Sequence, residues 1–456
     1  MNKLIYILMI GGILMGNAGC RKYVEIPPEQ SKVLSTTTDY QQLLYNYNTI
    51  EQSYFYPLYS GDDITSEEAT WQNTLNPTVT NVHTWNEKFV SSSEEDTDWS
   101  ETYKRIFIYN TVISGVMGST GSDSEKQAAR ASALLHRAYD YYTLVNSYAK
   151  QYDAATAATD PGVPLVLEPK FLTDLTRASI AQVYDQVLAD ITQAIPALPN
   201  LPDFSPNPSK AAAYAILARV YLNKREFTEA KRYAELSLGL KSALLDLNSY
   251  KAAPTTIPNK VLNPEELLFK RTRSGSNSFP LSADAESMFD KVNDLRYTIF
   301  TGAGPSVPGS NTLNTRVYMR FRLAGDGTYV GPSVPEMMLI KAECEARANN
   351  PSAAAAVLNE LRKKRFNNTV PYVDVAPASG DAALRMVIDE RKREFLGRGF
   401  RWFDQRRLTK DAGFVNTVTR VFKGTTYRLE PNSNRYTFAI GDKYIDFNPE
   451  IIQNPR

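Results

Sequence analysis

The stretch that decides the fold is residues 389–408, which read DERKREFLGRGFRWFDQRRL. It begins as a charged amphipathic helix, is interrupted by Gly397 and Gly399, and then mixes aromatic side chains with arginines. Guanidinium groups stack on aromatic faces and pair with carboxylates, and four acids lie in the same stretch. A phosphate-binding surface would repel those acids, so we interpret the stretch as a structural knot. Its central residues are Arg398, Arg401, Trp402, Phe403 and Asp404.

A twelve-residue spacing of alanines occurs in two helical segments. It separates Ala218 from Ala230, and again Ala342 from Ala354. Small residues at this offset let two antiparallel helices cross closely, as they do in tetratricopeptide repeats. The two hairpins are far apart in the sequence, which excludes a regular solenoid.

Amphipathic periodicity predicts two further helices, over 124–149 and over 179–195, and Ser179 is the expected cap of the second. The predicted fold class is therefore mainly α. We expect an irregular, tetratricopeptide-repeat-like helical scaffold of about four helix hairpins, with long loop insertions and a few short strands. The expected strands are 162–167, 315–322 and 436–440.

Three long insertions interrupt the helical pattern, at residues 52–100, 150–176 and 250–333. They are rich in Ser, Thr, Asn, Gly and Pro, and they are too long to be simple connections. Loops of this length on a rigid scaffold usually carry the function of a protein. We therefore expect the ligand-binding residues in these insertions.

The N-terminus has the pattern of an export signal. Lys3 precedes an apolar run over 4–15 that only Gly11 and Gly12 interrupt, and small residues then lead to Cys20. The run is too short to span a bilayer core of about 30 Å. A lipoprotein signal peptidase accepts small residues before a cysteine, so we expect a lipid on Cys20. The alternative is an ordinary cleaved signal followed by an incidental cysteine.

Several motifs resemble those of the SusD/RagB family of nutrient-uptake proteins. The 389–408 stretch is similar to the family's E-R-x-x-E-F-x-x-x-G-x-R-W-F-D-x-x-R segment. LHRAYDYYTLV at 135–145, PGVPLV at 161–166 and FNPEIIQNP at 447–455 resemble further family motifs in the same order. The sequence departs from the family pattern at Ala439 and Gly441, where prolines are usual.

The resemblance implies a non-enzymatic lipoprotein that is anchored at Cys20 and exposed on the surface of the outer membrane. It would cap a SusC-like TonB-dependent transporter and deliver a captured glycan or other oligomeric nutrient to it. It also implies a cleaved signal over 1–19, an N-terminal part with a ligand-loop insertion over 20–200, and a C-terminal part over 201–456. We expect the two parts to pack as one globular unit.

The composition points away from nucleic acid and from enzyme chemistry. The chain has 51 basic and 50 acidic residues, a net charge of +1, which gives no electrostatic case for a nucleic-acid partner. His83, His136 and Cys344 are isolated and cannot form a zinc site of ordinary spacing. No phosphate-binding loop or G-x-S-x-G motif occurs, so we expect no cofactor.

The acids Asp62 and Asp63 lie together in the first insertion. A glycosidase needs one carboxylate on each side of the scissile bond, which adjacent acids do not provide. A solvated surface or a loop-bound calcium ion is the simpler interpretation, although the spacing of an EF-hand is absent.

Sugar rings have one apolar face and equatorial hydroxyls, so glycan sites pair flat aromatic rings with carboxylates and amides. Trp71 lies in an acidic, polar loop, and we expect its indole to be partly exposed and to act as a stacking platform. Asp62 and Asp63 are expected to bind sugar hydroxyls beside it. The other candidates are Tyr56, Trp85, Phe279, Tyr297 and Phe300.

Core packing is the alternative for each of these aromatic residues. Two alternative functions also remain open at this point: the same fold could bind peptides, or the protein could be a helical-repeat scaffold that assembles envelope proteins.

Overall fold

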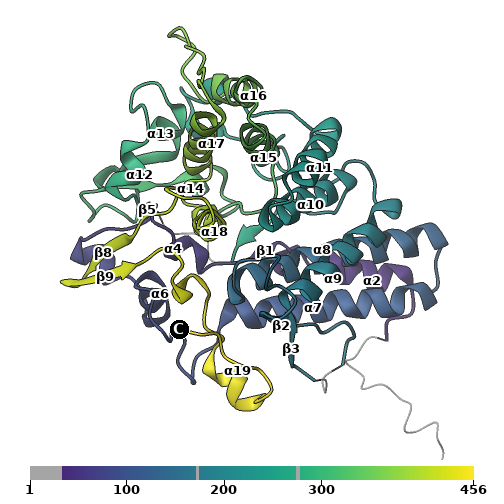
Figure 1. The fold of residues 1–456 in the computed structure, drawn as a ribbon. Helices are drawn as coiled ribbons and strands as arrows, with labels where there is room; N and C mark the ends of the chain where they lie inside the picture. Colours follow the sequence, from purple (N-terminus) through teal and green to yellow (C-terminus); the bar gives the residue numbers. More distant parts are fainter. Residues whose placement is uncertain (1–32, 171–173, 274–277) are drawn as a thin grey trace, which may run out of the picture.

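The computed structural model of the chain describes residues 33–170, 174–273 and 278–456. The expected signal segment and Cys20 lie outside these residues. The long helices occupy the right and upper parts of Figure 1, and the short elements of the insertions gather on the left. No helix in the described ranges is both long and apolar enough to cross a membrane.

The N-terminal part is built on long antiparallel helices. Helix α8 packs between α7 and α9, and α2 packs against α7 and α8. A capping box closes the start of α8 through Ser122 and Glu125, and another closes α9 through Ser179 and Gln182. Both helices that the periodicity predicted are confirmed to within a residue. The four helices are α2 (Thr37–Leu44), α7 (Thr97–Gly115), α8 (Asp123–Tyr148) and α9 (Ile180–Ala194).

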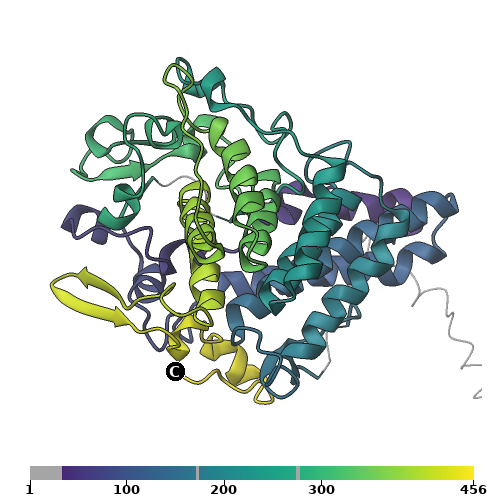
Figure 2. The same ribbon diagram turned by 45° about the horizontal axis from the view of Figure 1, so that its top comes forward.

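The two alanine-spaced hairpins are present and lie side by side. Ala218 and Ala230 are fully buried where α10 crosses α11, as are Ala342 and Ala354 where α15 crosses α16. Helix α15 also packs on α11 and α17, which joins hairpins that are far apart in the sequence. Figure 2 shows these helices from a second direction. They are α10 (Lys210–Lys224), α11 (Phe227–Leu240), α15 (Val334–Arg347), α16 (Pro351–Lys363), α17 (Gly380–Glu394) and α18 (Phe400–Leu408). The predicted fold class is confirmed.

Short helices and strands make up the insertions and the C-terminus. The short helices are α3 (Tyr47–Ile50), α4 (Pro57–Ser60), α5 (Ala69–Gln72), α6 (Pro77–His83), α12 (Ala283–Ser287), α13 (Leu295–Phe300), α14 (Arg320–Ala324) and α19 (Asp442–Phe447). The strands are β1 (Gln52–Ser53), β2 (Pro161–Pro164), β3 (Arg177–Ser179), β4 (Arg271–Thr272), β5 (Phe279–Pro280), β6 (Thr301–Ala303), β7 (Arg316–Tyr318), β8 (Val418–Phe422) and β9 (Thr425–Leu429).

The strands form small separate sheets. β1 pairs with β4 in parallel, β2 pairs with β3, and β7 lies between β5 and β6. The expected strands at 162–167 and 315–322 correspond to the shorter β2 and β7. The strand expected at 436–440 is wrong, because this segment runs against the end of α8, where the Phe438 amide donates to the Ser147 carbonyl at 3.0 Å.

The β8–β9 hairpin was not predicted. Its turn places Lys423 at φ 48° and Gly424 at φ 77°. Two adjacent residues with positive φ form the type of turn whose twist matches that of a two-stranded hairpin. The hairpin packs over the first insertion, where the Val421 carbonyl accepts a hydrogen bond from the side chain of Gln72, the residue after Trp71.

The first insertion and the 250–333 insertion are held together at several points. The backbone of Ile64 bridges to Leu281, and β1 pairs with β4. The Glu68 carboxylate accepts hydrogen bonds from the backbone N–H groups of Asn314 and Thr315, at 2.8 Å each. The two insertions therefore meet in one place on the helical scaffold.

Candidate functional site

A polar cleft with a volume of about 530 Å³ opens where these two insertions meet. This volume is within the roughly 300–1,000 Å³ that is typical of small-molecule sites. We call it the loop cleft, and its lining includes residues of α4 and β5, the elements labelled in Figure 1. Its lining includes Phe55, Tyr59, Thr70, Trp71, Asn76, Arg273, Phe279 and Thr312.

The loop cleft combines polar groups with buried aromatic walls. Thr70, Asn76 and Thr312 are exposed and present hydroxyl and amide groups. The Thr70 hydroxyl donates to the Thr312 carbonyl at 3.4 Å, which links the two walls. Phe279 packs edge-on against Tyr59, with ring centroids 5.6 Å apart. Such a surface can bind a ligand that has both hydroxyl groups and apolar faces.

The expected exposure of Trp71 is wrong, because its side chain is only 5% exposed. The indole packs edge-to-face on the His83 ring, with centroids 5.0 Å apart and planes at 81°. Strand β8 covers this region, since the Gln72 side chain donates to the Val421 carbonyl at 3.0 Å. Trp71 therefore forms part of the wall of the loop cleft and cannot offer a free ring face.

Trp85 and Tyr56 are core residues outside the loop cleft. Trp85 is 3% exposed, its indole N–H donates to the Ser60 carbonyl at 3.0 Å, and Arg420 stacks 4.2 Å from the ring centroid. Tyr56 is 2% exposed and packs edge-on against Phe89. Neither ring is available to stack on a sugar.

Asp62 and Asp63 line a separate pocket of about 240 Å³ and not the loop cleft. The Arg401 guanidinium binds both Asp62 oxygens, at 2.6 Å and 2.7 Å. Burial alone would raise the pKa of Asp62, but the Arg401 charge holds it below its ordinary value. Burial and the neighbouring Asp62 carboxylate raise the pKa of Asp63 to about 6. The two acids do not line the cleft that Trp71 lines, so the expectation that they lie beside Trp71 is wrong.

Three aromatic candidates from the 250–333 insertion differ in position. Phe279 lines the loop cleft. Tyr297 and Phe300 do not, and guanidinium groups cover their rings, from Arg316 at 3.9 Å and from Arg320 at 4.7 Å. Phe279 is therefore the only one of the three that the structure brings together with Trp71.

Sequence reasoning did not find several residues of the loop cleft. Thr70, Asn76, Arg273 and Thr312 all lie in the predicted insertions, but no motif or spacing distinguishes them from other loop residues. Only the fold places them on one surface.

Residues 389–408 are mostly buried. Trp402 is fully buried and stacks on Phe438, with centroids 5.5 Å apart and planes at 6°. The Asp404 carboxylate accepts hydrogen bonds from Arg391 at 3.1 Å and from Arg407 at 2.7 Å. Burial would raise the pKa of Asp404, but these arginines lower it to about 2. These contacts support the structural interpretation of this stretch.

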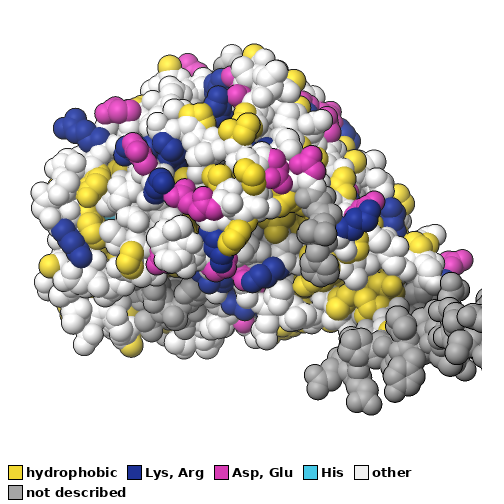
Figure 3. Space-filling view, turned by 90° about the horizontal axis from the view of Figure 1, so that it is seen from below, with side chains coloured by type: hydrophobic (Ala, Val, Ile, Leu, Met, Phe, Trp, Pro, Cys, Tyr) yellow, Lys and Arg dark blue, Asp and Glu magenta, His cyan; other side chains and the backbone are white. Residues whose placement is uncertain are grey.

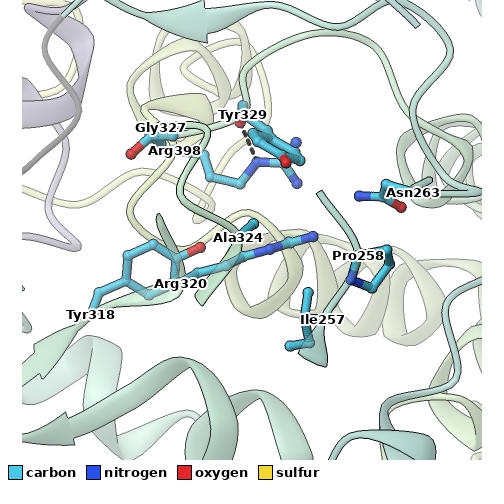
Figure 4. Close-up of a pocket in the computed structure, with 10 residues that line it drawn as sticks. Ile257, Pro258, Asn263, Tyr318, Arg320, Ala324, Gly327, Tyr329 and Arg398 are labelled. Carbon is cyan, nitrogen blue, oxygen red and sulfur yellow. Dashed lines mark hydrogen bonds between the residues drawn. The ribbon is translucent and has the colours of Figure 1, made fainter. Parts of the chain in front are cut away.

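Phe403 and Arg398 extend the same set of contacts. Phe403 packs edge-on against Tyr54, with centroids 5.1 Å apart. The Arg398 side chain donates from Nε to the Tyr329 carbonyl at 2.6 Å, the bond drawn in Figure 4. The pocket in that view, between Arg398 and Arg320, has space for about one water molecule, about 10 Å³.

The charges on one face of the molecule and the possible metal ligands among the described residues bear on whether the protein has another kind of site. On the face shown in Figure 3, acidic and basic side chains alternate and do not gather into a patch of one sign. Within the ranges that the structure describes, no group of three or more His, Cys, Asp or Glu side chains could hold a metal ion. Nothing here supports the calcium ion considered for Asp62 and Asp63.

The comparisons with known proteins agree with the architecture. A family model described as "Starch-binding associating with outer membrane" matches residues 22–222, and a "SusD family" model matches residues 334–456. The chain belongs to the SusD/RagB family. SusD-like protein P2 of Formosa agariphila is 28% identical over 368 residues, which cover 68% of this chain and 71% of the relative.

Solved structures share the fold. A SusD superfamily protein from Bacteroides thetaiotaomicron has a TM-score of 0.76 at 20% identity, covering 92% of this chain and 100% of the other. A laminarin-binding SusD-like protein has a TM-score of 0.63 at 17% identity, covering 92% and 99%.

Proposed function

We propose that this protein is a lipoprotein of the outer-membrane surface that binds an oligosaccharide in the loop cleft. It delivers the ligand to a SusC-like TonB-dependent transporter and does not cleave it. The observation that carries the proposal is the loop cleft itself, a polar opening that the two long insertions build on a rigid helical scaffold.

The chemistry of the loop cleft suits a sugar. Thr70 and Thr312 provide hydroxyls and Asn76 provides an amide, and these groups can exchange hydrogen bonds with sugar hydroxyls. Trp71 and Phe279 line the cleft and can provide a small apolar contact for C–H faces. The laminarin-binding relative and the starch-binding description of the family model add support for a glycan.

The transporter role rests on membership of the family. A protein that delivers its ligand to a transporter must bind the ligand with moderate affinity, and it needs no catalytic residues at the binding site. None of the loop-cleft residues in the described ranges is a carboxylate, so a pair of acids flanking a scissile bond is not found there.

A glycan panel tests the proposal. The purified protein is titrated by calorimetry with oligosaccharides and with peptides of similar size, and the glycans are then checked for cleavage by chromatography. We expect heat from at least one glycan and no cleavage product. Heat from peptides alone would replace the glycan with a peptide ligand, and a cleaved glycan would contradict the binding-only role.

Two variants locate the site. Asn76 caps α6 by accepting from the Val79 amide at 2.8 Å, so Asn76→Ser is chosen because serine keeps a capping oxygen while it removes the amide group. Asn76→Ser and Thr312→Val each remove a polar group from an exposed position of the loop cleft, so they should weaken glycan binding while leaving the melting temperature nearly unchanged. Asn368→Ala, outside the loop cleft, is the matched control. Unchanged affinity in both cleft variants would place the site elsewhere.

A further inference from the structure

Arg273 is the single charged side chain among the described residues that line the loop cleft. It directly follows β4, whose pairing with β1 holds the backbone on the scaffold. Its guanidinium carbon lies 5.9 Å from the centroid of the Phe55 ring, another wall residue. The fold therefore places this charge at the cleft.

No described residue accepts a hydrogen bond from this guanidinium. Its Nε is buried without an acceptor, and Arg273 forms no ion pair in the described part of the chain. By contrast, each buried arginine of the described ranges donates to a carboxylate or a backbone carbonyl, as Arg105 does to Asp140. Arg273 therefore differs from the structural arginines of this protein.

Two carboxylates of the first insertion, Glu68 and Asp98, have backbone hydrogen-bond partners. Glu68 accepts the two backbone N–H groups of Asn314 and Thr315. Asp98, whose titration responds to the Arg273 charge, accepts the N–H groups of Phe55 at 2.8 Å and Tyr56 at 2.9 Å through one oxygen. Neither acid forms a hydrogen bond or an ion pair with Arg273. The second Asp98 oxygen is buried without a hydrogen-bond partner and acts on Arg273 only through its charge, so the Arg273 guanidinium has no hydrogen-bond acceptor among the described residues.

The buried Nε cannot reach a ligand, but the terminal N–H groups of Arg273 also have no acceptor among the described residues, and a planar guanidinium matches a carboxylate or sulfate with two parallel hydrogen bonds. We propose that the ligand of the loop cleft is an acidic oligosaccharide, whose carboxylate or sulfate group binds Arg273. This inference rests on the proposed function. It makes Arg273 a specificity-determining residue, while the hydroxyl and amide groups of the cleft bind the neutral part of the sugar.

The test uses acidic oligosaccharides, each paired with its own neutralised form. Pectin- and alginate-derived uronates are paired with their methyl esters, and sulfated galactan fragments with desulfated ones. Laminarin fragments and acidic peptides complete the panel. We expect at least one acidic oligosaccharide to bind about 10- to 100-fold more tightly than its neutralised form, with affinity that falls as salt rises. The uronate and sulfate arms show which anion the cleft prefers.

Variants of Arg273 connect this preference to the site. Arg273→Gln should lower the affinity for the acidic form to that of the neutralised form, and Arg273→Lys should keep part of the preference. Arg232→Gln removes an exposed arginine of α11 and is the charge-matched control. Circular dichroism melting confirms that each variant is folded.

The possible failures are distinguishable. Equal affinity for acidic and neutral glycans, or an acidic preference that survives Arg273→Gln, overturns this inference and leaves the glycan function in place. Binding of acidic peptides alone overturns both, as does a panel in which nothing binds.

Discussion

Arg401 and Asp62 form a two-bond ion pair across 339 residues of sequence, which ties α18 to the first insertion. The side chain of Arg401 is 7% exposed and that of Asp62 is 32% exposed. The pair lies outside the loop cleft, so it supports the fold of the insertion without contacting the proposed ligand.

Arg401→Gln should therefore destabilise the protein without a direct effect on binding. Removing one partner leaves the other charge partly buried, and we expect a loss of about 1–3 kcal/mol in the free energy of unfolding. Urea denaturation measures it, with Arg232→Gln as the control, because that arginine belongs to an exposed pair that should contribute at most about 1 kcal/mol. Equal stability of the two variants would contradict the prediction.

Trp402 should be among the most costly side chains to remove. It is fully buried and stacked on Phe438, so Trp402→Ala should lower the free energy of unfolding by about 3–5 kcal/mol. Phe447→Ala is the control for loss of an aromatic ring, because Phe447 is 76% exposed. Protein that still folds should bind the glycan as the wild type does. A stable Trp402→Ala variant without binding would assign this segment to the ligand site.

Structural features that depend on local sequence could be predicted, whereas contacts between distant parts of the chain could not. The helices α8 and α9 follow from periodicity and capping, and the hairpins follow from alanines twelve residues apart, because these signals are local. The partner of Asp62 is not local. Only the folded chain brings Arg401 to it, so the acid was expected at the ligand.

The burial of Trp71 also depends on residues that are distant in the sequence. Its polar neighbours in the sequence indicate an exposed loop, but the ring is covered by His83 and by a hairpin whose Val421 contact lies 349 residues away from Gln72. The two insertions were predicted as long loops; the structure places short helices and strands in them, and residues of both line the cleft. Which residues line it depends on contacts such as that of Glu68 with Asn314, for which the sequence has no signature.

Trp71→Ala is now expected to affect stability more than a surface change would. Because the indole is 95% buried against His83, its removal should lower the free energy of unfolding by about 3–5 kcal/mol. Binding should also weaken, since the ring forms part of the cleft wall. Thermal denaturation with and without glycan separates the two effects, and Trp71→Phe should restore part of both. An unchanged melting temperature for Trp71→Ala would show that the ring is not packed in this way.

Cys20 is the proposed site of the lipid that attaches the protein to the membrane. If it carries a lipid, Cys20→Ala should leave the protein in the soluble fraction or as an uncleaved precursor, because two acyl chains provide the anchoring. Phase partition of cell extracts measures the distribution. Cys344→Ala, which changes a buried cysteine of α15, is the control for loss of a thiol. A Cys20→Ala variant that still partitions into detergent at normal levels would contradict lipid anchoring.

Asp96 should make stability depend on pH. Its carboxylate caps α7 by accepting from the Trp99 amide at 3.2 Å and also accepts from the Tyr148 hydroxyl at 2.7 Å, while its other oxygen is buried without a partner. Burial is the main cause that raises its pKa to about 8.

An acid whose pKa is higher in the folded state binds more protons when folded, so its contribution to stability is present at low pH and is lost as pH rises. Between its unfolded pKa of about 4 and its folded pKa of about 8, the Asp96 contribution should fall steadily.

Urea denaturation at pH 5 and pH 8 should therefore show wild type losing more stability over this interval than Asp96→Asn, which cannot ionise. Taking the difference between the two proteins cancels the contribution of buried groups that do not interact with Asp96, such as Asp63, whose pKa burial raises to about 6. The charge of Asp98 acts on Asp96, so the difference reports these two acids together. Asp381→Asn, at an exposed position in the first turn of α17, should follow the wild-type pH dependence. Parallel pH profiles for wild type and Asp96→Asn would show that Asp96 is already ionised at pH 5 in the folded protein.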